Sequence, residues 1–255
     1  MKTVFKGSSP PSLQKYLATF PQARWGEMRD DGLHGGKNVY KEVRAHLFVD
    51  QGGLCAYCES SLDWDAPQTM RVEHFHPKSD RSLHHNWDLA WENLLLTCLG
   101  GEKGDYPLPE NLSCDAHKKN VIHDKDIVNP LFLPPFPQAF LFNLQTGKLQ
   151  PNPAFCATYP KLPGHVLAST EALLINTLLV LNLNYDRLCC ARLEVLYFIE
   201  RQKKLLRLQN IPANQALPRL VQRFFASPWP QFFTVVRQVL NPYADQFLMG
   251  ILYQG

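Results

Sequence analysis

Four cysteines constrain this chain more than any other feature of its sequence. Cys55 and Cys58 are separated by two residues, and Cys98 and Cys114 follow them within the same third of the chain. Two thiolates at this first spacing can converge on one tetrahedral ion, and two more would complete the closed four-thiolate arrangement of structural zinc sites. The segment between Cys98 and Cys114 is long and contains glycines, so only folding can bring that pair together. The sequence therefore predicts a structural Zn²⁺ site.

Two other interpretations of these cysteines stay open. They could be four unrelated buried thiols, or the first pair could bind zinc together with His74 and His76. The second arrangement has an unusually tight His-x-His spacing and leaves the later two cysteines without a role. The remaining three cysteines lie far along the chain, and we interpret them as core or surface thiols. These are Cys156, Cys189 and Cys190.

Composition bears on location and partners. With 255 residues, 45% of them hydrophobic, the chain can bury a sizeable core, and its net charge of +3 permits nucleic-acid binding without requiring it. Residues 1–13 contain no apolar signal core, and the apolar run from Leu173 to Leu183 is too short to span a bilayer. We therefore expect a cytoplasmic protein without membrane contact, whose cysteines form no disulfides.

The pattern of the chain predicts an α+β fold in four parts. These are an irregular arm (1–37), a cysteine- and histidine-rich core (38–125), a proline-rich connector (126–168) and a helical region (169–255). Helical spacing predicts a helix over about 38–50, which a glycine pair then ends. Prolines argue against helix in the connector, where a short hairpin is expected near 140–147. Later helices should begin at Ser169 or Thr170 and at Asp186, with two or three shorter ones after them.

Polar residues follow the cysteines in a specific order. Glu73 and His74 stand at the end of a predicted strand and offer a hard oxygen ligand beside a base that titrates near neutral pH. Asn93 precedes an apolar run, and Asp115 and Lys118 share one face of a predicted short helix that starts beside Cys114. Each residue alone is commonplace, but the order of the whole set is distinctive.

This order resembles the HNH endonucleases, whose small ββα-metal core commonly sits on a four-cysteine zinc site. The segments LCAYCE, VEHFHPKS, WENLLLTC and Cys-Asp-x-x-Lys are most similar to the HNH nucleases of Septu and retron-associated anti-phage systems. The resemblance spans about residues 40–205 and includes IVNPL and LLVLNLNYDRL outside the nuclease core. It implies a ββα-metal core within a mainly α-helical chain.

The resemblance also implies roles for individual residues. His74 corresponds to the general base, Glu73 and Asp115 to ligands of a catalytic Mg²⁺ or Mn²⁺ ion, and Asn93 to the residue that orients the intervening loop. His76 and Lys118 are further candidates for auxiliary roles, with His76 either a metal ligand or a plain neighbouring histidine. Many family members carry Asp where this chain has Glu, which lengthens that ligand arm by one carbon.

The expected function is metal-dependent hydrolysis of nucleic acid, DNA in preference to RNA, in a defence complex with an ABC-type ATPase. The alternative class is a non-catalytic zinc module that binds nucleic acid or a protein. A nucleobase deaminase is excluded, because it requires His-x-Glu before a Pro-Cys-x-x-Cys and this chain has the reverse order. Basic residues of the second late helix, Arg187 and Arg192 among them, form either a phosphate-binding stripe or a solvated helix face.

Overall fold

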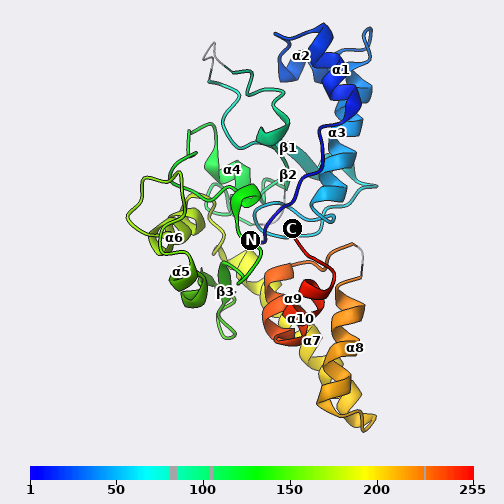
Figure 1. The fold of residues 1–255 in the computed structure, drawn as a ribbon, viewed down its shortest axis with the longest axis vertical. Coiled ribbons are helices and arrows are strands. Elements are labelled where there is room, and N and C mark those ends of the chain that lie inside the picture. Colours follow the sequence, from blue (N-terminus) through cyan, green and yellow to red (C-terminus); the bar gives the residue numbers. More distant parts are fainter. Residues whose placement is uncertain (81–84, 104–105, 227) are drawn as a thin grey trace.

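The computed structural model describes residues 1–80, 85–103, 106–226 and 228–255, and it combines helices with two small sheets (Figure 1). The N-terminal part holds α1 (Pro11–Thr19), α2 (Trp25–Asp30), α3 (Gly36–Asp50), β1 (Met70–His74), β2 (Leu94–Cys98) and α4 (Cys114–Lys118). The rest holds β3 (Phe140–Phe142), β4 (Leu149–Pro151), α5 (Pro153–Thr158), α6 (Thr170–Val180), α7 (Asp186–Leu208), α8 (Ala213–Phe224), α9 (Phe233–Leu240) and α10 (Tyr243–Gly250). Three short 3₁₀ turns complete the described elements: Pro67–Thr69, Trp91–Asn93 and Pro130–Phe132.

The first sheet forms the centre of the molecule. β1 and β2 pair antiparallel, with Met70 opposite Cys98 and His74 opposite Leu94. α3 and α4 both pack against β2, and α4 follows the two strands in the chain. The predicted helix over 38–50 is confirmed and begins slightly earlier, at Gly36. The predicted strand ending at Glu73 and His74 is also present.

The prediction of an irregular N-terminal arm is wrong. Residues 1–37 contain α1 and α2, which pack on α3 at the upper end of the molecule in Figure 1. Pro11 occupies the first turn of α1, where a missing N–H and a fixed φ favour helix initiation. Leu13, Trp25 and Met28 are buried, so the arm belongs to the main core.

The connector contains the predicted hairpin and one helix that was not predicted. β3 pairs with β4, and the Asn143 side chain accepts hydrogen bonds from the two backbone N–H groups that open the turn. The expectation that prolines exclude a helix from the connector is wrong at PNPAF (151–155), because Pro153 begins α5 and Asn152 caps it by accepting from the N–H of Ala154 at 3.0 Å. A proline at the first helical position removes no helical hydrogen bond.

The C-terminal helices begin where the sequence predicts. Ser169 Oγ accepts from the N–H of Ala172 at 3.1 Å to cap α6, and α7 starts at Asp186. α7 does not present a continuous basic stripe, because Arg192 is buried and donates to the carbonyls of Gly147 and Leu183. No helix within the described ranges combines the length and apolar character needed to cross a membrane.

Candidate active site

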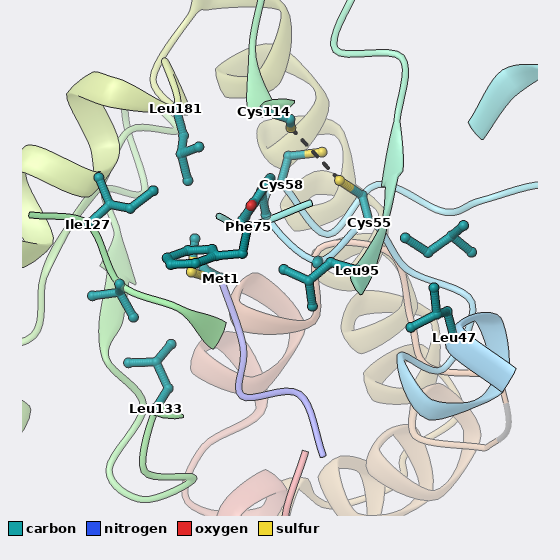
Figure 2. Close-up of a cluster of buried hydrophobic side chains, with 14 of the residues drawn as sticks. Met1, Leu47, Cys55, Cys58, Phe75, Leu95, Cys114, Ile127, Leu133 and Leu181 are labelled. Atoms are coloured by element: carbon teal, nitrogen blue, oxygen red, sulfur yellow. Dashed lines mark hydrogen bonds between the residues drawn. The ribbon is translucent and has the colours of Figure 1, made fainter. Parts of the chain in front are cut away.

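The structure brings the four predicted cysteines together. Their ligand atoms lie within 4.8 Å of one another, and the side chains of Cys55, Cys58 and Cys114 converge in Figure 2. The Sγ–Sγ distances are 3.8 Å for Cys55–Cys114, 3.7 Å for Cys58–Cys98 and 3.8 Å for Cys98–Cys114. A tetrahedron with zinc–sulfur bonds of about 2.3 Å has edges of about 3.8 Å. Three of the six Sγ–Sγ distances match these edges and the others do not exceed 4.8 Å, so the four thiols fit one tetrahedral zinc ion with little rearrangement.

The first cysteine pair sits on a tight backbone loop. The N–H of Cys55 donates to the carbonyl of Ser60 at 2.9 Å, and the N–H of Glu59 donates back to the carbonyl of Cys55 at 3.1 Å. The carboxylate of Glu59 accepts from the N–H and the hydroxyl of Thr234 at 3.0 and 2.6 Å. Thr234 lies on α9, so the C-terminal helices hold this loop in place.

The glycine-containing segment explains how the second pair meets. Gly100 has φ +63°, and its carbonyl accepts from the N–H of Ser113 at 2.8 Å. A Cβ on Gly100 would lie 2.2 Å from the carbonyl oxygen of Ser113, so only glycine allows this approach. The N–H of Cys114 then donates to the carbonyl of Leu181 at 2.8 Å, and Arg187 donates to the hydroxyl of Ser113 at 3.0 Å. The start of α7 thus supports the end of α4 that carries Cys114.

Charge also favours a cation between the four thiols. Burial raises the pKa of the Cys55 thiol well above its usual value, whereas hydrogen bonds from neighbouring thiols lower the pKa of Cys58. One thiolate shared among its neighbours is therefore tolerated, but four buried thiolates would repel one another strongly. A divalent cation removes this obstacle, because it deprotonates coordinating thiols and neutralises their charge.

His74 ends β1 as a buried, neutral histidine. Its Nε2 lies 2.9 Å from the backbone carbonyl oxygen of Asp88, and a carbonyl only accepts hydrogen bonds. Nε2 therefore carries the proton, which leaves Nδ1 with a free lone pair. The ring of Trp25 packs edge-to-face on the imidazole at 4.8 Å and 86°. Burial lowers the pKa of His74 to about 4, so the ring is uncharged near neutral pH, as a general base must be.

Asn93 fixes the chain that follows His74. Its side-chain oxygen accepts from the N–H of His76 at 2.7 Å, and its side-chain nitrogen donates to the carbonyls of His76 and Trp87 at 2.9 and 2.8 Å. Its own carbonyl accepts from the N–H of Phe75 at 2.9 Å. The amide is thus directed at backbone, which is the arrangement expected of a residue that orients a loop.

Glu73 and Asp115 form the acidic part of the site. Glu73 is paired with Lys118 of α4, whose Nζ lies 2.9 Å from Oε1 and also donates to the carbonyl of Phe75 at 3.1 Å. Burial raises the pKa of Glu73. Burial, followed by the charge of Glu73, raises the pKa of Asp115 to about 7. Asp115 Oδ2 lies 3.3 Å from Nε of Arg71, whereas the buried Oδ1 lacks a well-formed hydrogen bond to any described residue.

These two carboxylates fit an open site for Mg²⁺ or Mn²⁺ and not a closed one. Apart from the four cysteines, no three His, Cys, Asp or Glu side chains in the described ranges converge as ligands. Mg²⁺ is commonly held by one or two carboxylates and retains several waters. Oδ1 of Asp115, which has no well-formed hydrogen bond within the described ranges, and the mutual repulsion of Asp115 and Glu73 both favour a cation there.

His76 points elsewhere. Its Nδ1 lies 2.6 Å from Oδ2 of Asp124 and its Nε2 lies 2.9 Å from Oδ2 of Asp80. The ring also stacks on Trp87, with centroids 4.3 Å apart. Both nitrogens are thus directed at carboxylates in this arrangement, and neither is directed at Glu73 or Asp115.

The structure adds residues that sequence reasoning missed. A cleft of about 460 Å³ beside His74 is lined by Arg24, Trp25, Lys78 and Asp88. Arg24 and Trp25 come from the N-terminal segment, which carries no motif. Asp88 holds both, because its carboxylate accepts from the N–H of Trp25 at 2.9 Å and lies 3.5 Å from Arg24, while its backbone carbonyl contacts His74. Among these four cleft residues, Lys78 alone belongs to a segment that the sequence analysis singled out, VEHFHPKS.

Comparison with known proteins identifies the class of enzyme. No family model matches the chain. It is 39% identical over 240 residues to the "Retron Ec83 putative HNH endonuclease" of Escherichia coli, covering 87% of this chain and 91% of that protein. It is also 31% identical over 122 residues to the "Retron Vc95 putative HNH endonuclease" of Vibrio cholerae serotype O1 biovar El Tor, covering 43% of this chain and 57% of that protein. These relatives place the protein in the class of nucleases. The chain belongs to the HNH endonuclease family.

Proposed function

We propose that this protein is a metal-dependent endonuclease that cleaves DNA in preference to RNA, with a ββα-metal core formed by β1, β2 and α4. The observation that carries the proposal is His74, a neutral imidazole whose Nδ1 has a free lone pair at the end of β1. Lys118 of α4 lies 3.5 Å from the carbonyl oxygen of His74 and 2.9 Å from Glu73, so the helix carrying Asp115 meets the strand carrying the base.

Each residue of the candidate site has its own role in the proposed hydrolysis. Nδ1 of His74 accepts a proton from the water that attacks the scissile phosphorus. Asp115 and Glu73 would hold the divalent ion, which supplies neutralisation of phosphate charge and stabilisation of the leaving oxygen. Lys118 orients Glu73, and Asn93 fixes the loop beside the base. Arg24 and Lys78 line the adjacent cleft; Arg24 is ion-paired with Asp88 at 3.5 Å, whereas the charge of the exposed Lys78 would attract the phosphate backbone.

The four cysteines would hold a structural zinc in this account. Because the closed thiolate site leaves no open coordination position, it stabilises the fold and takes no part in hydrolysis. Thiolates select zinc, whereas carboxylates select Mg²⁺ or Mn²⁺, so the two kinds of site are expected to take different metals.

We further propose a setting in anti-phage defence, in complex with an ABC-type ATPase. The names of both relatives associate those proteins with retrons, and the motif set of this chain resembles that of the Septu nucleases. The ATPase would license cleavage, so activity assays should be run with and without an ABC-type ATPase of such a defence system. Cleavage in either condition supports the nuclease proposal, and a requirement for the ATPase supports the complex.

Asp115→Ala tests the proposed catalytic ion. The variant is expected to need at least about 10-fold more Mg²⁺ or Mn²⁺ for half-maximal cleavage of a DNA strand, because one of two carboxylate ligands is lost. Its zinc content and folding should match the wild type, since Asp115 is no thiolate ligand. The measurements are a cleavage rate at graded metal concentrations and elemental analysis of the same preparation.

Asp65→Ala is the matched control, because Asp65 is an exposed carboxylate of the same region. It should leave the metal titration unchanged. If Asp115→Ala loses zinc, Asp115 belongs to the structural site and the division into two metal sites is wrong. If its metal titration is that of the wild type, Asp115 is not a ligand of the catalytic ion.

A further inference from the structure

A second, larger hollow lies beside the active-site loop, distinct from the cleft at Arg24. It has a volume of about 690 Å³ and lies between the nuclease core and the proline-rich connector. Its lining includes Trp87, His85, Phe132, Asp124 and His165. Pockets of this size, with apolar walls and a few polar groups, are typical of sites for small planar ligands. The catalytic residues described above leave this pocket without a role.

Aromatic rings form much of its wall. Trp87 stacks on His76 at 4.3 Å and 29°, and His85 packs against the same indole at 4.2 Å. Phe132 is 75% exposed on the opposite segment, although an aromatic side chain of its size is usually buried. Rings placed in this way provide flat surfaces on which a nucleobase can stack.

Two polar atoms in the lining have unused hydrogen-bonding capacity. Oδ1 of Asp124 and Nδ1 of His165 are buried and lack well-formed hydrogen bonds to the part of the chain that the structure describes. The other oxygen of Asp124 is bound by His76 at 2.6 Å, so the carboxylate is held in a fixed orientation. A carboxylate oxygen accepts from a base N–H, and a histidine nitrogen can pair with a ring nitrogen or a carbonyl. Buried polar atoms without partners are unfavourable unless a ligand satisfies them.

The pocket is also next to the proposed reaction centre. Phe75 and His76 line it and directly follow the base His74, while Asn93 lines it and fixes that same loop. If a phosphate of a nucleic-acid strand lies at His74, a neighbouring nucleotide of that strand therefore lies at the mouth of the pocket. The acidic Asp124 and Glu92 in the lining disfavour a phosphate inside it, but an uncharged base is not repelled.

We propose that this pocket binds one unpaired nucleobase of the strand being cleaved, next to the scissile phosphate. The inference rests on the proposed function, since it takes nucleic acid as the substrate, and it narrows the substrate to single strands or to duplexes with an unpaired base. A paired base cannot enter, because its hydrogen-bonding edge and both faces are occupied within the duplex.

Binding measurements on the full chain test this proposal separately from cleavage. Fluorescence anisotropy would follow a short labelled DNA strand of mixed sequence bound to His74→Ala protein, which does not degrade the probe. Adding Phe132→Ala should weaken binding about 5- to 100-fold, the effect expected when one base loses an aromatic stacking partner. Phe132 is mostly exposed, so its removal should leave folding and zinc content intact. Tyr197→Ala is the control, because Tyr197 is an exposed aromatic on α7 outside the pocket lining.

A set of strands with a single abasic position locates the base. In protein that retains Phe132, one abasic position in the strand should weaken binding. In the Phe132→Ala variant, the same abasic position should have little further effect on binding. The same set of strands made of RNA shows whether binding depends on the sugar. The proposal is overturned if single strands do not bind, if Phe132→Ala and Tyr197→Ala behave alike, or if no abasic position depends on Phe132. Failure of metal-dependent cleavage with these binding effects intact would count against the proposed function alone.

Discussion

His74→Ala is expected to reduce the rate of DNA cleavage by about 10²–10⁴-fold, the usual effect of removing a general base. The physical reason is the state of the ring in the wild type. Its Nε2–H is committed to the carbonyl of Asp88, and burial lowers the pKa of His74 to about 4, so Nδ1 is free and unprotonated at neutral pH. Alanine removes this proton acceptor and leaves the carboxylates in place. The measurement is a single-turnover cleavage rate with saturating metal.

The folding of this variant must be checked, because His74 is buried against Trp25. Zinc content and the urea unfolding midpoint provide that check, and His34→Ala provides a control, since His34 is exposed. A folded His74→Ala protein that cleaves like the wild type would show that the base has been misassigned.

Cys58→Ser is expected to abolish zinc binding and to leave the protein unfolded or insoluble. Structural zinc contributes about 10–16 kcal/mol in small zinc modules, whereas the net stability of a protein domain is about 5–15 kcal/mol. The loss should be large here because Cys55, Cys58 and Cys114 lie in the same buried core cluster as Leu95 and Leu181 (Figure 2), and Cys98 packs against that cluster. Elemental analysis and circular dichroism of the expressed variant measure the two effects.

Cys190→Ser is the matched control, since Cys190 is an exposed thiol on α7. It should retain the zinc and the fold of the wild type. Wild-type protein that is fully folded without zinc would contradict the assignment, and so would a Cys58→Ser variant with normal zinc content.

Local patterns predicted much of the fold. The helix that ends at Asp50, the caps of α6 and the start of α7 follow from side-chain periodicity and capping residues, which act over a few positions. The errors came from prolines. The N-terminal arm was predicted to be irregular and the connector to lack helix, but Pro11 and Pro153 each occupy the first turn of a helix, where proline is favoured. A proline alone does not show on which side of it the helix lies.

The candidate site was only partly predictable for a different reason. The order of cysteines, Glu73, His74 and Asp115 is written in the sequence, and the convergence of the four thiols is confirmed. The contact of Trp25 with His74 joins residues from separate elements, and no motif marks it. The ion pair between Nζ of Lys118 and Oε1 of Glu73 also joins residues from separate elements, and no motif specifies it. Such contacts depend on tertiary packing, which sequence spacing does not specify.

The central claim is that a closed structural zinc and an open catalytic ion coexist in one small core. Brief EDTA treatment, followed by elemental analysis and a cleavage assay on the same sample, tests it most directly. We predict that one zinc per chain survives, because four buried thiolates enclose it, while cleavage is lost and returns on adding Mg²⁺ or Mn²⁺ without refolding. Loss of zinc together with activity, with recovery only when zinc is restored, would contradict the account.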